Sequence, residues 1–330
     1  MVVGLLTGPT VAPLTVRGYD LYQAVLATGL WLHWRPKPLP HEVVQMQKIL
    51  AVISEWDTGP RVLERARFLA AQLHAELALL RPVQSQVGEW HKYLPPGDFA
   101  PLRDAIMAAE RERFETARGA DPGEVLWCER AYRVVVEQAE SQGANLIVME
   151  ASRHGLLENI IHRADDWHLL REAPCPVLLL PRTPRPLTSV VAAVDALAEG
   201  PEQELLAERV LDAASAFARA QQVPLRVVTV MPDPAMIYAS PMAVPLSTDV
   251  IGELNERARG AQQALLQRIG LSADEQRIET GRVEDVLAEL AADGLLVIGS
   301  VANRGLKGLV LGNTAERILY HMTTEMLVVN

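Results

Sequence analysis

The sequence predicts an α/β protein that contains two doubly wound, parallel-sheet domains in tandem. Two short apolar runs, Ile49–Ile53 and Val190–Val194, lie about 140 residues apart, and the same alternation of helical and strand-like patterns follows each of them. Strands that alternate with helices form parallel sheets, with helices on both faces and right-handed crossovers. A chain of 330 residues, 49% of them hydrophobic, is long enough to bury a core in each of two domains.

The first copy of the repeat occupies residues 46–182. Its strand at 49–53 leads into a helix that begins at Pro60 and carries an apolar residue every three or four positions, which is typical of a helix packed on a sheet. The elements predicted after that helix are a strand at 75–80, a proline-rich loop at 81–101, a helix at 102–118, a strand at 125–128, a helix at 132–141, a strand at 146–149, a helix at 166–171 and a strand at 177–180.

The second copy occupies residues 189–330 and repeats this order. Its strand at 190–194 is followed by a helix that begins at Pro201 and has the same apolar spacing. The elements predicted next are a strand at 225–230, a proline-rich loop at 231–247, a helix at 249–269, a strand at 276–279, a helix at 283–292, a strand at 295–298, a helix at 314–321 and a strand at 326–329.

Two segments lie outside the repeat. Residues 1–45 contain scattered prolines and no sustained helical or strand period, so we expect an irregular N-terminal extension. Residues 183–188 include Pro184 and Pro186 and are expected to form a stiffened linker between the two copies.

Composition excludes several classes of partner. The formal net charge of -10 and the pI near 5.4 argue against a nucleic-acid partner, because binding to a phosphate backbone requires a basic face. No apolar run reaches roughly 18 residues, and no basic residue precedes Arg17, so neither a membrane span nor a signal peptide is expected. Cys128 and Cys175 lie far apart and are expected to be buried thiols. These features predict a cytoplasmic protein.

The best local signal for chemistry follows a strand of the second copy. Gly299–Ala302 comes directly after that strand, and Gly312–Thr314 begins the next helix, with nine residues between them. Ligands of open parallel sheets bind beyond the carboxyl ends of the strands, where glycine lets backbone N–H groups approach an anion. Asn313 and Glu316 form a capping-box-like pair that leaves N–H groups directed toward a phosphate. In the alternative interpretation, both glycines serve only as turn residues.

Asp195 ends the first strand of the second copy and faces the same crevice. It is placed to accept a hydrogen bond from a ribose hydroxyl, or alternatively to cap the helix that follows.

Three histidines, His154, His162 and His168, do not share one helical face, so they are expected to be exposed or hydrogen-bonded, and no metal site is predicted.

These motifs resemble the universal stress protein family. That family is marked by Gly-x2-Gly-x9-Gly-(Ser or Thr) after its fourth strand and by an aspartate after its first, and the resemblance covers residues 47–330. Leu311–Glu316 and, in the first copy, Asp166–Arg171 are similar to the tandem-domain, E-type subgroup. The fold that this resemblance implies is Rossmann-like, of the adenine nucleotide alpha hydrolase-like kind, in both halves.

The resemblance implies a nucleotide site, with ATP as the candidate cofactor, in the second copy alone. That motif is partial, because Ala302 stands at the second glycine and Asn313 replaces the Ser or Thr. In the first copy Glu150 and Arg153 stand at the two glycines and residues 163–166 replace the last, which puts carboxylates where phosphates would lie. The residues expected to bind the nucleotide are Val194, Asp195, Val230, Ile298, Gly299, Ala302, Gly312, Asn313 and Thr314.

The function that these observations favour is a non-catalytic stress-response protein. The resemblance also implies that the two copies form an intramolecular pseudo-dimer and that two chains associate as a homodimer. One alternative is an ATP-hydrolysing enzyme of related fold, for which Asp195 is the candidate group. The other is a carrier of an apolar ligand, covered by the loop at 231–247, which contains Met236, Ile237 and Tyr238.

Overall fold

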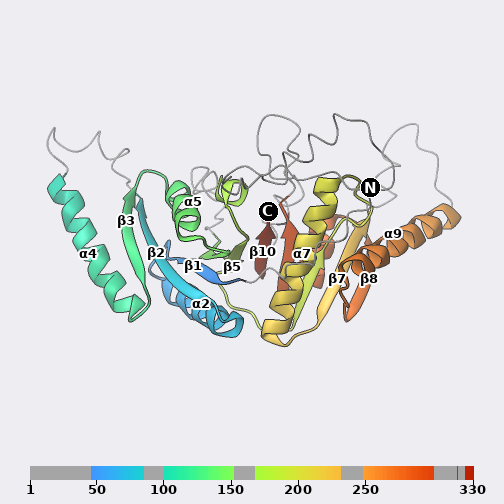
Figure 1. Cartoon of the computed structure of the whole chain (residues 1–330), viewed down its shortest axis with the longest axis horizontal. Coiled ribbons are helices and arrows are strands. Elements are labelled where there is room, and N and C mark those ends of the chain that lie inside the picture. The colour runs from blue at the N-terminus through green and yellow to red at the C-terminus, as the bar shows by residue number, and fades with distance from the viewer. Residues whose placement is uncertain (1–45, 85–99, 152–167, 232–247, 301–317, 319–323) are drawn as a thin grey trace, which may run out of the picture. The chain divides into compact units, whose positions relative to one another are not determined.

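The computed structural model describes residues 46–84, 100–151, 168–231, 248–300, 318 and 324–330 (Figure 1). The described residues belong to one compact unit, Val43–Asn330. The predicted extension at 1–45 and most of both proline-rich loops lie outside the described residues. Of the predicted helix at 166–171 the structure describes residues 168–171, which are helical, and of the one at 314–321 it describes Ile318, which is helical too.

Both copies have the predicted alternation of strands and helices. The first copy contains β1 (Lys48–Val52), α2 (Gly59–Leu73), β2 (Glu76–Gln84), α4 (Ala100–Arg118), β3 (Gly123–Cys128), α5 (Ala131–Gln142), β4 (Leu146–Glu150) and β5 (Val177–Leu180). The second contains β6 (Ser189–Ala193), α7 (Pro201–Gln221), β7 (Leu225–Met231), α9 (Thr248–Ile269), β8 (Glu275–Thr280), α10 (Val283–Leu290), β9 (Gly294–Gly299) and β10 (Glu325–Val329).

The ten strands form one continuous sheet in the order β3-β2-β1-β4-β5-β10-β9-β6-β7-β8. Every neighbouring pair within a copy is parallel. The two copies join through β5 and β10, which are antiparallel, with Leu178 opposite Leu327. This topology confirms the predicted α/β fold class.

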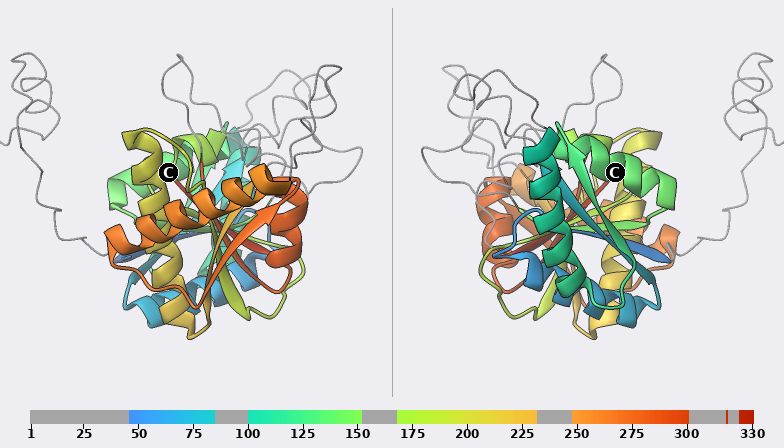
Figure 2. Two further views of the ribbon diagram at one scale, coloured as in Figure 1. Left: turned by 90° about the vertical axis from the view of Figure 1, so that its right-hand side faces the viewer. Right: turned by 90° about the vertical axis from the view of Figure 1, so that its left-hand side faces the viewer.

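Helices cover both faces of the sheet (Figure 2). On one face the apolar sides of α2, α4, α7 and α9 pack in one core, with Leu69, Phe114 and Phe217 fully buried. On the other face α5 and α10 cover a second core, in which Val135 and Leu287 are buried. The described part of the chain contains no helix that is long and apolar enough to cross a membrane.

One predicted boundary is wrong for a physical reason. The loop expected from Arg81 is instead the end of β2, which continues to Gln84 and pairs with β3. Proline usually ends a strand because it lacks an N–H donor. The carbonyl of Leu80 accepts a hydrogen bond from the N–H of Ile53, so the backbone polar groups of Leu80 face β1. The backbone nitrogen of Pro82 faces the same side but lies beyond the last residue of β1. Its missing N–H therefore costs no hydrogen bond between the two strands. The helix predicted to reach residue 292 ends at Leu290.

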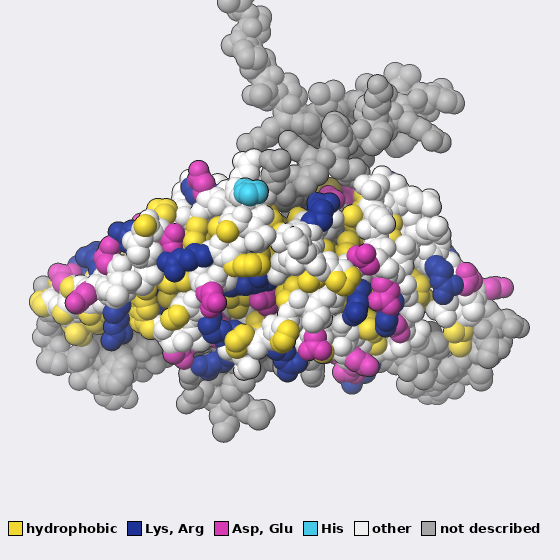
Figure 3. Space-filling view, turned by 90° about the horizontal axis from the view of Figure 1, so that it is seen from below, with side chains coloured by type: hydrophobic (Ala, Val, Ile, Leu, Met, Phe, Trp, Pro, Cys, Tyr) yellow, Lys and Arg dark blue, Asp and Glu magenta, His cyan; other side chains and the backbone are white. Residues whose placement is uncertain are grey.

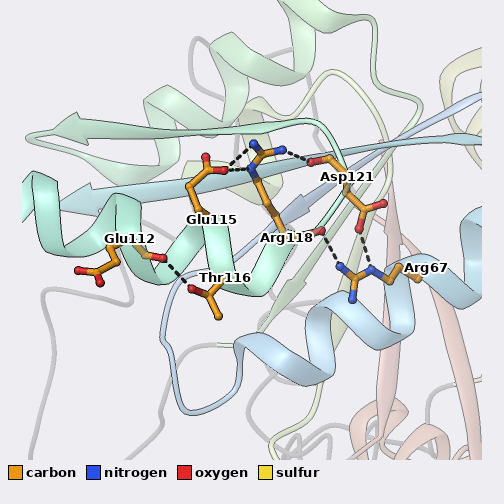
Figure 4. Close-up of polar contacts among 6 residues, drawn as sticks. All are labelled: Arg67, Glu112, Glu115, Thr116, Arg118 and Asp121. Carbon is orange, nitrogen blue, oxygen red and sulfur yellow. Dashed lines mark hydrogen bonds and ion pairs between the residues drawn. The ribbon is translucent and has the colours of Figure 1, made fainter.

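Ion pairs fix α4 against α2 at the edge of the first copy (Figure 4). The Arg67 Nε atom lies 2.7 Å from Asp121 Oδ2, and Arg67 Nη2 donates to the carbonyl of Arg118. Arg118 in turn pairs with Glu115 on its own helix. Among the described residues, acidic and basic side chains are also interspersed on the face of the molecule seen from below (Figure 3).

Candidate functional site

The candidate site of the second copy lies where the order of its strands reverses. The chain leaves β6 toward β7 and β8 on one side, whereas β9 and β10 lie on the other. The carboxyl ends of β6 and β9 therefore form a topological switch point, which is where open α/β sheets bind ligands.

A cavity of about 240 Å³ occupies this switch point. Its walls come from both faces of the sheet, since α7 contributes to one side and α10 to the other. Most of the lining is apolar, and Asp195 and Gln203 supply its polar side chains. The lining residues are Ala193, Val194, Asp195, Ala198, Gln203, Leu206, Ala207, Val210, Val228, Val230, Val283, Leu287, Ile298, Gly299 and Ile318.

The structure brings together five of the nine predicted site residues. Val194 and Asp195 follow β6, Val230 lies near the end of β7, and Ile298 and Gly299 end β9; all five line the cavity. The other four, Ala302, Gly312, Asn313 and Thr314, lie outside the described residues.

The backbone of Gly299 lies close to Leu206 of α7. A Cβ atom at this position would lie 2.7 Å from Leu206 Cδ2, closer than real Cβ contacts. Its backbone is not in the left-handed region that favours glycine. A left-handed turn does not explain the glycine at this position, and the missing side chain leaves room for Leu206 of α7.

Asp195 is exposed and forms a turn of its own. Its Oδ1 atom accepts a hydrogen bond from the N–H of Leu197 at 3.1 Å, which is an Asx turn. The N-cap position of α7 is occupied by Gly200, so the alternative in which Asp195 caps that helix is wrong. The carboxylate stands at the rim of the cavity, directly after β6.

Ser300 has a structural role beside the cavity. Its N–H donates to the carbonyl of Val329 at 2.7 Å, and its hydroxyl lies 2.5 Å from Asn330 Oδ1. These bonds join the end of β9 to the end of β10. Among the described residues, no group of three or more His, Cys, Asp or Glu side chains is arranged to hold a metal ion.

Strand pairing shows which residues of the two copies correspond. Ile49 pairs with Leu77 and Leu146, and Val190 pairs in the same way with Leu225 and Leu295. Residues that lie equally far along the chain from these paired residues occupy equivalent positions in the two copies. Ser54 corresponds to Asp195, Arg81 to Thr229, and Glu150 to Gly299.

A largely buried ion pair lies at the carboxyl end of β2 in the first copy. Arg81 Nε lies 2.8 Å from Glu110 Oε2, and the Arg81 guanidinium also donates to the carbonyls of Ile53 and Ser54. Glu110 accepts a further bond from the indole of Trp56, whose ring lies under Arg81. Although burial opposes it, hydrogen bonds from Arg81 and Trp56 lower the pKa of Glu110. This cluster fixes the chain that follows β1.

In the second copy an uncharged pair takes the place of this cluster. Gln262 of α9 is fully buried, and its Nε2 atom donates to Thr229 Oγ1 at 3.1 Å and to the carbonyl of Arg277 at 3.2 Å. No charge is thus buried at this position. The contrast was missed from the sequence because Arg81 lies in a segment that was predicted to be a loop. The contact of Leu206 with Gly299 was not predicted from the sequence either.

These features define a tandem α/β protein with a mostly apolar cavity at the switch point of its second copy. The chain belongs to the universal stress protein family, since the model of that family matches residues 46–181 and 188–330, one match for each copy.

Relatives cover nearly the whole chain. It is 26% identical over 300 residues to Universal stress protein E of Escherichia coli strain K12, a match that covers 86% of this chain and 93% of that protein. Universal stress protein E of Photorhabdus laumondii is 24% identical over 306 residues. These relatives support a tandem universal stress protein with a role in the stress response.

Solved structures show the same architecture. A putative universal stress protein from Pseudomonas aeruginosa superposes with a TM-score of 0.61 at 25% identity, covering 87% of this chain and 94% of that one. A universal stress protein from Archaeoglobus fulgidus superposes with a TM-score of 0.55 at 15% identity, which is evidence for the fold alone.

Proposed function

We propose that the chain is a cytoplasmic, non-catalytic stress-response protein whose second copy binds an adenine nucleotide, with ATP as the candidate. The observation that carries this proposal is the cavity at the β6–β9 switch point, which five residues predicted from the sequence line together. Apolar walls from both faces of the sheet suit a planar base, and Asp195 at the rim suits the ribose hydroxyls.

The rest of the nucleotide is assigned by the motif. In this proposal Ala302 and residues 312–314 contact the phosphates through backbone N–H groups. The first copy acts as a structural partner, because Glu150 stands where Gly299 stands in the second. The homodimer and the absence of a nucleic-acid partner stay predictions from the sequence.

Titration calorimetry with ATP tests this assignment. Replacing Asp195→Ala removes a charged acceptor of the ribose and is expected to weaken ATP binding about tenfold or more. The matched control is Ser54→Ala at the equivalent position of the first copy, which should leave the affinity unchanged. Equal effects of both substitutions, or none from Asp195→Ala, would contradict the proposal.

A carrier of an apolar ligand is the second candidate. The observation that favours it is the lining of the cavity, in which Leu206, Val210 and Ile318 are among many apolar side chains. Mass spectrometry of small molecules extracted from the purified full chain separates the two candidates. An adenine nucleotide supports the first, and a lipid or other apolar compound supports the second.

A further inference from the structure

The segment that connects the two copies is fastened at both ends. We call residues 181–188, between β5 and β6, the connecting segment. Toward the second copy, Thr188 donates its N–H to the carbonyl of Asp293 at 2.8 Å, and Arg185 donates to the carbonyl of Ala292 at 3.2 Å. Toward the first copy, the side chain of Arg61 donates to the carbonyl of Pro181.

Arg182 turns back over the switch point of the first copy. Its Nη2 atom lies 3.0 Å from Asp57 Oδ2, beyond the end of β1, and its Nε atom lies 4.0 Å from Glu150 Oε1, at the end of β4. The strand order reverses between β1 and β4. Arg182 therefore bridges the position where a doubly wound sheet binds its ligand.

Glu150 is the buried anchor of this arrangement. Its side chain is only 9% exposed, whereas those of Arg182 and Asp57 are 43% and 52% exposed. Within the described part of the chain, Glu150 Oε1 has no hydrogen-bond partner, and Arg182 is the cation beside it. Thr58 hydrogen-bonds to the same carboxylate, and its hydroxyl makes no cap bond to α2, although Thr58 is the N-cap residue.

We propose that Glu150, Asp57 and Arg182 form a pH-sensitive latch, which holds the connecting segment over the first copy's switch point while Glu150 is ionised and releases it when Glu150 is protonated. A buried carboxylate attracts Arg182 more strongly than exposed Asp57 does, because water screens the exposed pair. Protonation of Glu150 removes that attraction, so that Arg182 keeps only its exposed pair with Asp57.

The surroundings of Glu150 favour protonation. Burial raises the pKa of the Glu150 carboxyl, and the negative charge of Glu55 acts in the same direction, while Thr58, Arg182 and Arg61 oppose it. A carboxyl whose pKa is raised by folding costs stability when it is ionised, and this cost disappears as the pH falls through the raised pKa. Acid should therefore loosen the connecting segment and, at this residue, stabilise the fold.

Trypsin provides a direct measurement of the latch. It cuts after an arginine whose side chain enters its specificity pocket, so the Arg182–Thr183 bond is protected while Arg182 is held. Glu150→Gln imitates the protonated residue at constant pH. In the full chain, we expect it to speed cleavage at this bond about threefold or more, without faster cleavage at other arginines, and to raise the thermal midpoint by about 2 °C.

Two further variants complete the experiment. Asp57→Asn should speed the same cleavage less and needs no rearrangement of the core, so it is a second test if Glu150→Gln folds poorly. Glu172→Gln, which removes the exposed partner of His168, is the matched control and should change nothing at Arg182. The midpoint of the unmodified chain should approach that of Glu150→Gln as the pH falls through the raised pKa of Glu150.

Cleavage at Arg182–Thr183 that is the same in the unmodified chain, Glu150→Gln and Asp57→Asn overturns the proposal. Faster cleavage at all arginines together with a lower midpoint overturns it too, because general destabilisation then explains the result.

Discussion

The two copies share one fold but fill their switch points in opposite ways. In the second copy Gly299 and Asp195 border a mostly apolar cavity. In the first copy Glu150 replaces Gly299, and Arg81 at the end of β2 pairs with Glu110 of α4. Duplicated domains therefore keep the strand pairing that defines the fold while the side chains at the carboxyl ends of the strands diverge.

Burial explains why the first copy retains its charges. The side chains of Arg81 and Glu110 are 11% and 15% exposed, and the charge of each compensates the charge of the other. Loss of one partner leaves a buried charge uncompensated, which costs far more than the intact pair contributes. A single substitution at this pair should therefore cost more than one at the uncharged pair of Thr229 and Gln262.

The largest effect is expected from breaking that ion pair. Glu110→Gln leaves the Arg81 guanidinium without a counter-charge and should lower the free energy of unfolding by about 3–5 kcal/mol. The matched change in the second copy, Gln262→Leu, leaves only uncharged acceptors unpaired and should cost about 1–3 kcal/mol. Urea denaturation followed by circular dichroism measures both values.

The pH dependence sharpens this prediction. Because the pKa of Glu110 is lowered in the folded state, its contribution to stability is present above the pKa of the unfolded chain and is lost as the pH falls through the folded value. The difference between the unmodified chain and Glu110→Gln should shrink in acid. A larger cost for Gln262→Leu than for Glu110→Gln would contradict the comparison.

An intermediate effect is expected at Gly299. Gly299→Ala introduces a Cβ atom 2.7 Å from Leu206 Cδ2 and should destabilise the chain by about 1–3 kcal/mol. In a Leu206→Ala background the same substitution should cost less than about 1 kcal/mol, because the clash is gone. Equal costs in both backgrounds would show that Gly299 is required for another reason.

The smallest effect is expected at the exposed pair of Arg67 and Asp121. These side chains are 44% and 28% exposed, so Asp121→Asn should cost less than about 1 kcal/mol. Added salt should reduce the difference further, because it screens exposed charges. A loss that exceeds the one caused by Gly299→Ala would mean that this network controls the position of α4.

Much of the fold was predictable from the sequence. Apolar runs such as Val190–Val194 and helices with a proline in the first turn, Pro60 and Pro201, carry strong local signals, and the element order is confirmed. The end of β2 was missed because Pro82 is tolerated only through its position beyond β1, which depends on strand pairing.

Only those residues of the candidate site that lie at the ends of strands were predictable from the sequence. Val194, Val230 and Ile298 follow from the strands themselves. The contacts between Leu206 and Gly299, and between Arg182 and Glu150, join elements far apart in the chain. No local pattern indicates such pairs, because they arise from packing of helices and connections on the finished sheet.

The stoichiometry of ATP binding to the full chain tests the difference between the copies most directly. Titration calorimetry should give one site per chain, which Asp195→Ala weakens and Ser54→Ala leaves unchanged. Two equivalent sites, or one site that Asp195→Ala leaves intact, would contradict the assignment of the ligand to the second copy, and no binding at millimolar ATP would contradict the nucleotide itself.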